Sequence, residues 1–341
     1  MGKLSCSLAG AVLSLSMSLP FLSSSISFSS ISLFALLSPS TASAWDNGGE
    51  TKRGYSNPKY GVHDWIAEEA VNMLKENESS TEYGLLKEDE YSWINITYLL
   101  LGTEAPDNKA VANKVLGKTL AEGYGDPVNH HEYVDNAGNV IDDSAGRRAN
   151  EEYYKSLRAL VDGDYEHASF YLGAMIHYLS DLMGWAHVMG SGSVHDSEDP
   201  PEHVEFEKSV AKTISAKKMK DPNHTSTLFQ RFISFDGELE RIRAIEAAAR
   251  ITLRTNRGER YSCVEMQRML PMGKRGNGGY VDCSDWSEDY INEIGGTLNY
   301  GTNIIAGVIH TLNLDAHDIL TSSSPSSSNS SSSSLLLNAR D

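Results

Sequence analysis

The sequence predicts an all-α fold, a single-domain bundle of helices around an internal metal site. Three observations lead to this prediction. Apolar residues recur at intervals of three and four over several long stretches. Few stretches show the alternating pattern of a half-buried strand. Two pairs, each of a histidine and an acid four residues apart, could project metal ligands inward from facing helices.

The individual helices are predicted from this periodicity and from their capping residues. In the first, Ile66, Ala67, Ala70, Val71 and Leu74 fall on one stripe. Another begins with a capping asparagine followed by acids in its first turn. The predicted helices are 63–74, 150–160, 171–181 with continuation toward His187, 238–254 and 290–312.

Composition divides the chain into three parts. Residues 1–44 contain one charge and an apolar leucine- and serine-rich stretch, and they end in Ala42-Ser43-Ala44, which has the form of a signal-peptidase site. A membrane anchor is the alternative, although prolines interrupt this stretch. Residues 45–320 are predicted to form one catalytic domain, although two lobes are possible. Residues 321–341 are a serine-rich tail that cannot bury enough surface to fold.

Cleavage after residue 44 would make Trp45 the new N-terminus and predicts an exported protein. It would leave two cysteines, Cys263 and Cys283, and an even pair in an exported protein indicates a disulfide. The formal net charge of −17 disfavours broad electrostatic capture of nucleic acid.

Histidines and acids that suit metal binding are concentrated in about thirty positions. His177 and Asp181 lie one turn apart on a predicted helix, so an imidazole nitrogen and a carboxylate oxygen can reach one divalent ion. His187 follows six residues later, and His203 and Glu207 repeat the same spacing after two prolines. These residues make a zinc hydrolase the leading hypothesis.

A histidine and an acid at this spacing are more often a hydrogen-bonded surface pair. His177 differs because Ile176, Tyr178 and Leu179 indicate a largely buried helix. A buried ionised aspartate without a cation would lose several kcal/mol of solvation. The metal site is therefore the better interpretation.

These residues resemble the zinc-dependent phospholipase C family of secreted bacterial lecithinases and alpha-toxins. The likeness lies in His177-Tyr-Leu-Ser-Asp181, then His187, then His203 and Glu207. The same fold family includes single-strand-specific zinc nucleases and phospholipase C/D-type domains. In these enzymes the mature chain begins with a tryptophan that chelates zinc, and Trp45 fits that pattern.

The resemblance implies a site with three Zn²⁺ ions per chain. Trp45, His63 and Asp181 would hold one ion, and Asp181 would bridge to a second. His187, His203 and Glu207 would hold the third. The ligands implied for the second ion are Asp107, His131, His177 and Asp181, with His130 as the alternative to His131.

The resemblance also implies phosphodiester hydrolysis by a metal-activated water, which Asp107 would orient or deprotonate. Glu207 favours a phospholipase C, because the related nucleases generally have aspartate there. A zinc nuclease and a secreted binding protein without turnover are the alternatives. The expected partner is a phospholipid substrate at a membrane surface, without stable insertion, for a secreted monomer; nucleic acid is a partner only in the nuclease alternative.

Overall fold

The computed structural model of the protein describes residues 61–80, 90–125, 129–134, 139–188, 230–258 and 288–322. The predicted all-α class is confirmed within these residues, because helices predominate and the strands form one short hairpin. The elements are α1 (Val62–Ser80), α2 (Ile96–Glu104), α3 (Lys109–Leu116), β1 (Tyr133–Val134), β2 (Val140–Asp142), α4 (Ser144–Val161), α5 (Tyr165–Asp181), α6 (Trp185–Val188), the 3-10 helix η1 (Gln230–Phe232), α9 (Ala244–Gly258) and α11 (Glu288–Ser322).

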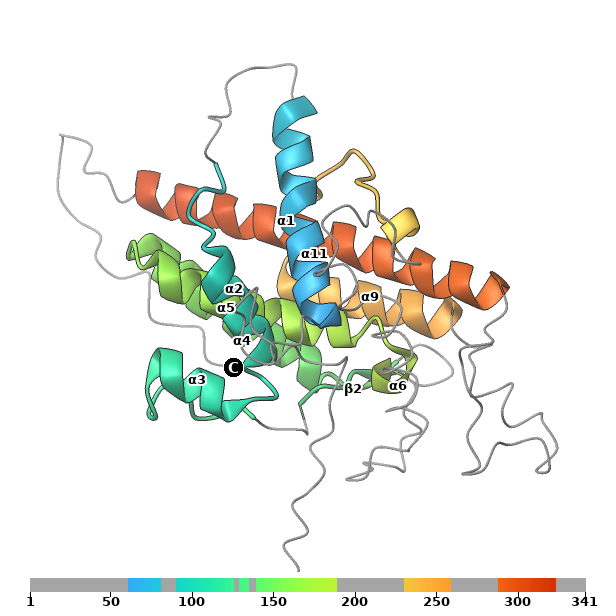
Figure 1. Ribbon diagram of the computed structural model, residues 1–341, viewed down its shortest axis with the longest axis horizontal. Coiled ribbons are helices and arrows are strands. Elements are labelled where there is room, and N and C mark those ends of the chain that lie inside the picture. Colours follow the sequence, from blue (N-terminus) through green and yellow to red (C-terminus); the bar gives the residue numbers. More distant parts are fainter. Residues whose placement is uncertain are drawn as a thin grey trace, which may run out of the picture. The chain divides into compact units, whose positions relative to one another are not determined.

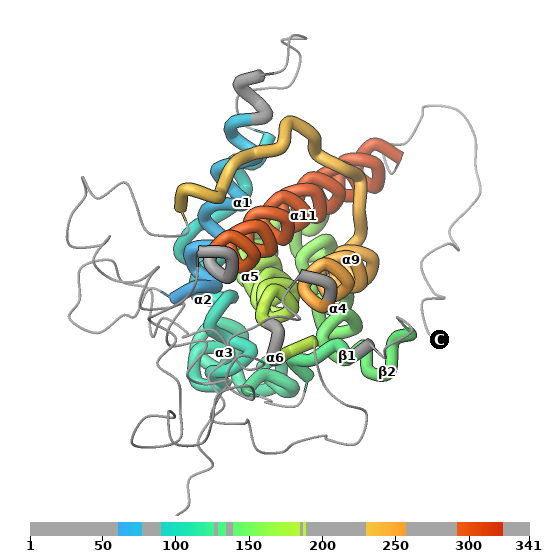
Figure 2. The backbone as a smooth tube through the Cα atoms, turned by 90° about the vertical axis from the view of Figure 1, so that its right-hand side faces the viewer, coloured from blue at the N-terminus to red at the C-terminus, as the bar shows by residue number. Residues whose placement is uncertain are grey.

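Helix α5 is the centre of the bundle. From Ala168 to Asp181 all of its residues except Tyr171 are buried. It packs against α4 and α2, and also against α1, α9 and α11 (Figures 1 and 2). A helix that is buried all round must satisfy its polar side chains inside the protein, and α5 carries such side chains at its C-terminal end.

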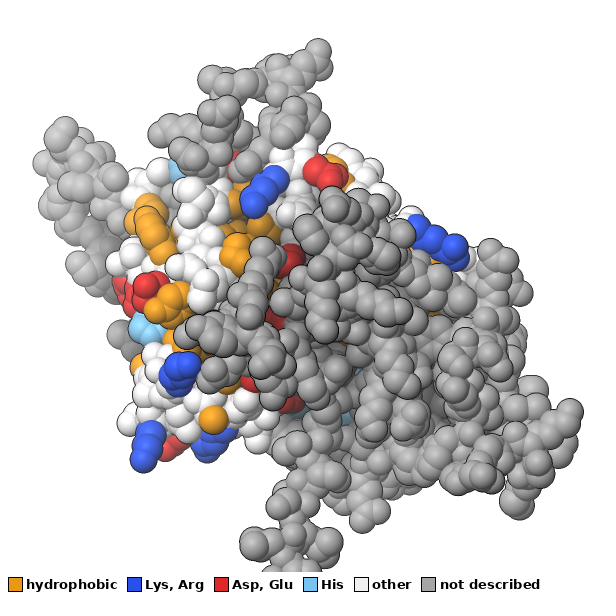
Figure 3. Space-filling view, viewed as in Figure 1, with side chains coloured by type: hydrophobic (Ala, Val, Ile, Leu, Met, Phe, Trp, Pro, Cys, Tyr) orange, Lys and Arg blue, Asp and Glu red, His pale blue; other side chains and the backbone are white. Residues whose placement is uncertain are grey.

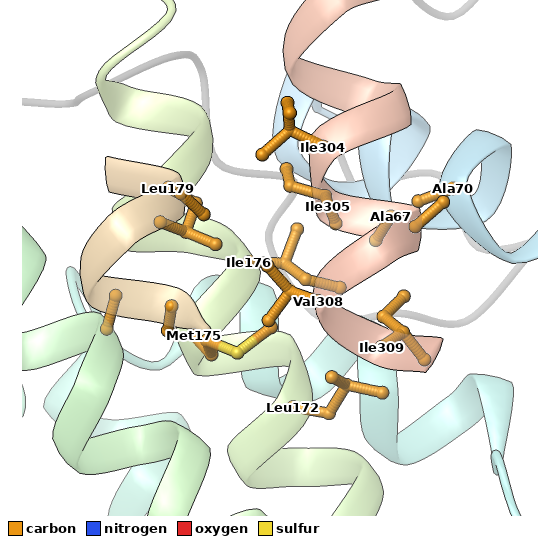
Figure 4. Packing of buried hydrophobic residues seen from close by; sticks show 14 of the residues in the cluster. Ala67, Ala70, Leu172, Met175, Ile176, Leu179, Ile304, Ile305, Val308 and Ile309 are labelled. Atoms are coloured by element: carbon orange, nitrogen blue, oxygen red, sulfur yellow. The ribbon is translucent and has the colours of Figure 1, made fainter. Parts of the chain in front are cut away.

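The apolar face of α5 forms the main core with α11 and α1. Isoleucine and valine side chains of α11 pack against leucine, methionine and isoleucine side chains of α5, beside two alanines of α1 (Figure 4). The predicted stripe of the first helix is confirmed, because all five of its residues are buried. The core residues that Figure 4 labels are Ala67, Ala70, Leu172, Met175, Ile176, Leu179, Ile304, Ile305, Val308 and Ile309.

Two glycines allow α2 and α5 to cross at close range. A Cβ atom on Gly102 would lie 2.0 Å from the carbonyl oxygen of Phe170, and one on Gly173 would lie 2.0 Å from that of Leu99. Neither distance is possible for a real side chain. The absence of both side chains therefore brings the end of α2 against the polar end of α5.

The structure moves the predicted N-terminus of the 150–160 helix. α4 begins at Ser144, whose amide donates to the Asp142 carboxylate at 2.8 Å, so Asn150 lies inside the helix and does not cap it. The first turns of α4 bury Ala145, Gly146 and Ala149. Small residues like these give little apolar periodicity, and the early turns were missed for this reason.

The predicted continuation of α5 toward His187 is wrong. α5 ends at Asp181, and a turn follows in which the Met183 amide donates to the Ser180 carbonyl at 3.0 Å. The short helix α6 then carries His187. This turn folds the chain back, so that His187 lies beside Asp181.

Helix α9 begins six residues later than predicted, because the preceding segment lies across α11. The Ile242 amide donates to the Thr311 hydroxyl at 2.8 Å. A Cβ atom on Gly307 would lie 2.7 Å from the Glu240 carbonyl oxygen, so glycine is needed at this crossing. α11 extends ten residues beyond the predicted end at Leu312.

Strands β1 and β2 pair antiparallel. None of the helices in the described residues is both long enough and apolar enough to cross a membrane. All described residues belong to one compact unit. The domain boundaries at 44/45 and 320/321 stay predictions. The predicted cleavage site, Trp45, His203, Glu207, the disulfide partners Cys263 and Cys283, and nearly all of the serine-rich tail lie outside the described residues.

Candidate metal centre

Histidines and acids from five segments meet at the C-terminal end of α5. His63 comes from the first turn of α1, Asp107 from the turn after α2, and His130 from the segment before β1. α5 supplies His177 and Asp181, and α6 supplies His187. Asp107 is the most exposed of the six, with 11% of its side chain accessible; the four histidines and Asp181 are buried.

The carboxylate of Asp181 is surrounded by imidazole nitrogens. His130 Nδ1 lies 2.7 Å from Asp181 Oδ2, and His177 Nε2 lies 3.3 Å from the same oxygen. His63 Nε2 lies 3.4 Å from Asp181 Oδ1, and His187 Nε2 lies 4.0 Å from it. Each carboxylate oxygen thus faces two histidine rings, which is the arrangement expected of a bridging ligand.

Asp107 lies beside two of these rings. Its Oδ1 is 3.4 Å from His130 Nε2 and 3.7 Å from His177 Nε2. Two sets of three ligand atoms are therefore close enough to hold an ion each: His63, His177 and Asp181, and Asp107, His130 and His177. The two sets share His177, so the two positions adjoin.

Hydrogen bonds to main-chain carbonyls orient two of the rings. His177 Nδ1 lies 2.7 Å from the Thr103 carbonyl, and His187 Nδ1 lies 2.9 Å from the His130 carbonyl. A carbonyl can only accept, so each Nδ1 carries a proton and donates it, and Nε2 is the nitrogen that faces the carboxylate. A second partner that fixes the ring in this way is typical of metal-binding histidines.

The Ser180 hydroxyl orients His63 through two hydrogen bonds. The Ser180 hydroxyl donates to the His177 carbonyl at 2.9 Å, so its oxygen accepts from His63 Nδ1 at 2.6 Å. Burial lowers the pKa of His63 well below its usual value, and the His177 ring lowers it further, against the opposing effect of Asp181. His63 is therefore neutral near pH 7, and the lone pair on its Nε2 points at a carboxylate.

Burial alone would raise the pKa of Asp181, but His177, His187 and hydrogen bonds from His130 and His177 together hold it well below its usual range. The carboxylate is therefore ionised. Within the described part of the chain, neither Asp181 Oδ1 nor His63 Nε2 has a hydrogen-bond partner, although both are buried. An anion that faces inward-directed lone pairs is stabilised by a cation between them. The donor set of imidazole nitrogens and carboxylate oxygens fits zinc.

His131 lies outside both sets of ligand atoms. Its ring stacks on the ring of His187, with centroids 5.0 Å apart. Its carbonyl accepts from the Ala145 amide and from the Ser144 hydroxyl, each at 3.0 Å, so the residue links α4 to the site. The structure thus brings the alternative residue, His130, to the position that the family resemblance implied for His131.

Sequence reasoning missed the residues that orient the ligands. Ser180 precedes Asp181 directly, and a serine inside a buried helix was a usable signal, because its hydroxyl must find a partner. Thr103 acts through its carbonyl, which any residue would supply, so no side-chain pattern could have identified it.

The match to a protein family supports a zinc-binding role for this centre. The sequence pattern of the family described as zinc dependent phospholipase C matches residues 62–252. Among solved structures, the chain is similar to "Alpha Toxin from Clostridium Absonum", with 16% sequence identity and a TM-score of 0.46. That similarity covers 74% of this chain and 64% of the toxin, so it spans less than two thirds of the toxin's length. No curated protein matches the chain.

Proposed function

Since the chain belongs to the zinc-dependent phospholipase C family, we propose that it is a zinc metallohydrolase that releases phosphorylated headgroups from phospholipids. The family pattern covers more than half of the sequence and includes all six residues of the buried cluster. The observation that carries the proposal is the arrangement around Asp181, where nitrogen atoms of four imidazole rings surround an ionised carboxylate.

We assign the ligands to three ions. His63 and Asp181 would hold the first ion with Trp45, and Asp107, His130, His177 and Asp181 would hold the second. His187 would hold the third with His203 and Glu207. His130 replaces His131 in this assignment because its ring contacts both Asp107 and Asp181. Trp45, His203 and Glu207 enter on the family resemblance alone.

The zinc ions, when bound, would lower the pKa of a water toward about 7 and neutralise charge on the phosphate. Asp107 is the most exposed acid of the cluster, so its carboxylate can contact a water that enters from solvent. It either orients that water or accepts its proton. Asp181, which is buried among the rings, positions the histidines and remains ionised.

A phospholipid is the proposed substrate, because Glu207 stands where the related zinc nucleases generally have aspartate, and because the formal net charge of −17 opposes broad capture of nucleic acid. The protein is proposed to act outside the cell after cleavage behind Ala44. N-terminal sequencing of the exported protein tests this step. A start upstream of Trp45 would leave that amine unable to bind zinc.

The activity is tested by measuring phosphocholine release from phosphatidylcholine beside nucleotide release from single-stranded DNA. We expect phosphocholine release that is lost with a chelator and restored by zinc. Asp107→Asn should lower kcat about 10²-fold or more, whereas the control Asp162→Asn, at the exposed C-cap of α4, should not. Activity on DNA alone would assign the nuclease. A zinc-loaded protein that is inert on both substrates would indicate a binding role.

A further inference from the structure

Segment 108–121, which contains α3, differs in charge from the rest of the chain. It has three lysines and no acidic residue, although the whole chain has a formal net charge of −17. Lys109, Lys114 and Lys118 are all exposed. Figure 3 shows lysine and arginine side chains at the lower left of the view, where α3 lies in Figure 1.

The buried side of this segment fixes which side faces solvent. Val111, Ala112 and Leu116 pack into a second apolar cluster with Phe170 and Ala174 of α5. Lys109 and Lys114 lie on the remaining, exposed part of α3, and Lys118 lies in the turn that follows it. Because the buried face of α3 packs against α5, the exposed lysines keep their orientation relative to the bundle.

An exposed leucine accompanies the lysines. Leu120 lies in the turn after α3, and 60% of its surface is accessible, the largest value among the exposed large apolar side chains of the described residues. The Ala121 amide donates to the Gly117 carbonyl at 3.1 Å, and Tyr124 donates to the buried Glu152 carboxylate. One hydrogen bond thus closes the turn that presents Leu120, and the Tyr124 hydroxyl anchors the chain just after it.

The same segment adjoins the metal centre. Asn108 caps α3 by accepting from the Ala110 amide at 3.1 Å, and it directly follows Asp107. The Gly125 amide donates to the Pro106 carbonyl at 2.6 Å, which closes the segment onto the turn that carries Asp107. A surface bound at α3 is therefore brought close to the proposed catalytic acid.

We propose that Lys109, Lys114, Lys118 and Leu120 form a docking surface for an anionic lipid bilayer. Lysines are attracted to anionic headgroups, and an exposed apolar side chain beside them can enter the boundary with the acyl chains. Charge complementarity alone would suit nucleic acid equally, and Leu120 is the residue that favours lipid. This proposal rests on the proposed function, because it brings a phospholipase to its substrate.

The test is vesicle binding of the exported, zinc-bound protein, measured by sedimentation within a time too short for detectable headgroup release, with calcium absent. Vesicles contain phosphatidylcholine alone or mixed with phosphatidylglycerol. Each lysine should raise the affinity for mixed vesicles about fivefold at low salt. The triple variant with Lys109→Gln, Lys114→Gln and Lys118→Gln should therefore bind mixed vesicles about 100-fold more weakly. Leu120→Gln should weaken it about tenfold, with little dependence on salt.

A matched control removes three exposed positive charges elsewhere, by Lys75→Gln, Arg231→Gln and Arg243→Gln, on α1, η1 and the segment before α9. It should bind mixed vesicles like the unaltered protein. Equal losses in the two triple variants would overturn the docking surface, because net charge alone would then explain binding. Tighter α3-dependent binding to single-stranded DNA than to vesicles would overturn it as well.

Hydrolysis of a monomeric short-chain phosphatidylcholine separates this proposal from the proposed function. The α3 triple variant should keep its rate on the monomeric lipid while losing rate on mixed vesicles. If the unaltered protein hydrolyses neither lipid, the proposed function fails while vesicle binding can still be measured. If the triple variant loses both rates equally, the lysines act in the site, and the docking proposal fails.

Discussion

Two neighbouring acids of this protein, Asp64 and Asp181, are both buried, yet their surroundings shift their pKa values in opposite directions. Burial raises the pKa of Asp64 to about 7, against hydrogen bonds from the Gly61 amide and the Thr103 hydroxyl. Burial also acts on Asp181, but the rings of His177, His187 and His130 outweigh it and hold its pKa well below the usual range. The region around Asp64 favours a neutral acid, and the region around Asp181 favours an anion.

The difference shows that burial of an acid does not by itself indicate a metal site. His63 and Asp64 are adjacent in sequence, but their side chains enter different regions: His63 reaches Asp181, and Asp64 reaches Thr103. A neutral acid with hydrogen-bond partners needs no cation. An ionised acid that faces imidazole nitrogens needs a cation beside it. The predictions below test whether the two regions differ in this way.

The largest effect is expected for Asp181→Asn. The amide keeps the shape of the side chain but loses the charge that two ions would share, so we expect kcat to fall about 10⁴-fold or more and bound zinc to decrease. The zinc-free variant should also be less stable than the unaltered zinc-free protein at neutral pH, because the histidine rings that hold the pKa of Asp181 low stabilise its ionised form in the folded state. Metal analysis and thermal unfolding check both results. Destabilisation with unchanged zinc content and zinc affinity would mean that Asp181 mainly supports the fold.

Gly173→Ala should disturb both regions together. The added Cβ would meet the Leu99 carbonyl and push α2 away from α5. Thr103, which bonds both His177 and Asp64, would move with α2. We expect a loss of about 3 kcal/mol of stability, at the upper end of overpacking effects. The control Gly163→Ala, in an open turn with φ of +77°, should cost only its backbone strain. Equal losses of stability in the two variants would show that the crossing of α2 and α5 is not tight.

His130→Gln and His131→Gln separate the two candidate ligands. If His130 is the ligand, its replacement should lower zinc affinity and kcat about 10²-fold or more, while His131→Gln should change both by less than about fivefold. Equilibrium dialysis against a competing chelator gives the affinities, and steady-state kinetics gives kcat. The opposite ranking would restore the assignment made from sequence.

The sequence predicted the fold class and the burial of His177 and Asp181, because both follow from apolar periodicity along α5. It could not choose between His130 and His131. Adjacent residues in an irregular segment have no periodicity, and only the folded chain shows which ring turns inward. It also missed the turn after Asp181, since Leu182 and Met183 continue the apolar pattern. The orientation of His177 by the Thr103 carbonyl depends on a close helix crossing that no local pattern describes.

Asp64→Asn tests the neutral region in the zinc-free protein. The folded-state pKa of about 7 lies above the usual 3.8, so the folded state binds more protons between these values and stability falls as pH rises from about 4 to 7. The amide mimics the protonated acid and should remove this loss, giving about 4 kcal/mol more stability at pH 8 and little change at pH 4. Urea unfolding at both pH values measures it. A gain of equal size at both pH values would contradict the assigned protonation.

The smallest effect is expected for Ser180→Ala. His63 Nδ1 would lose its acceptor, so the ring could turn and its Nε2 would face the ion less often. We expect zinc affinity to fall about 10-fold, with a small change in the stability of the zinc-free protein. Ser180→Thr keeps the hydroxyl and should restore most of the affinity if the added methyl is accommodated. Since Ser180 is also bonded to the His177 carbonyl, a loss of helix stability without a loss of zinc affinity would show that its hydroxyl serves α5 and not the metal centre.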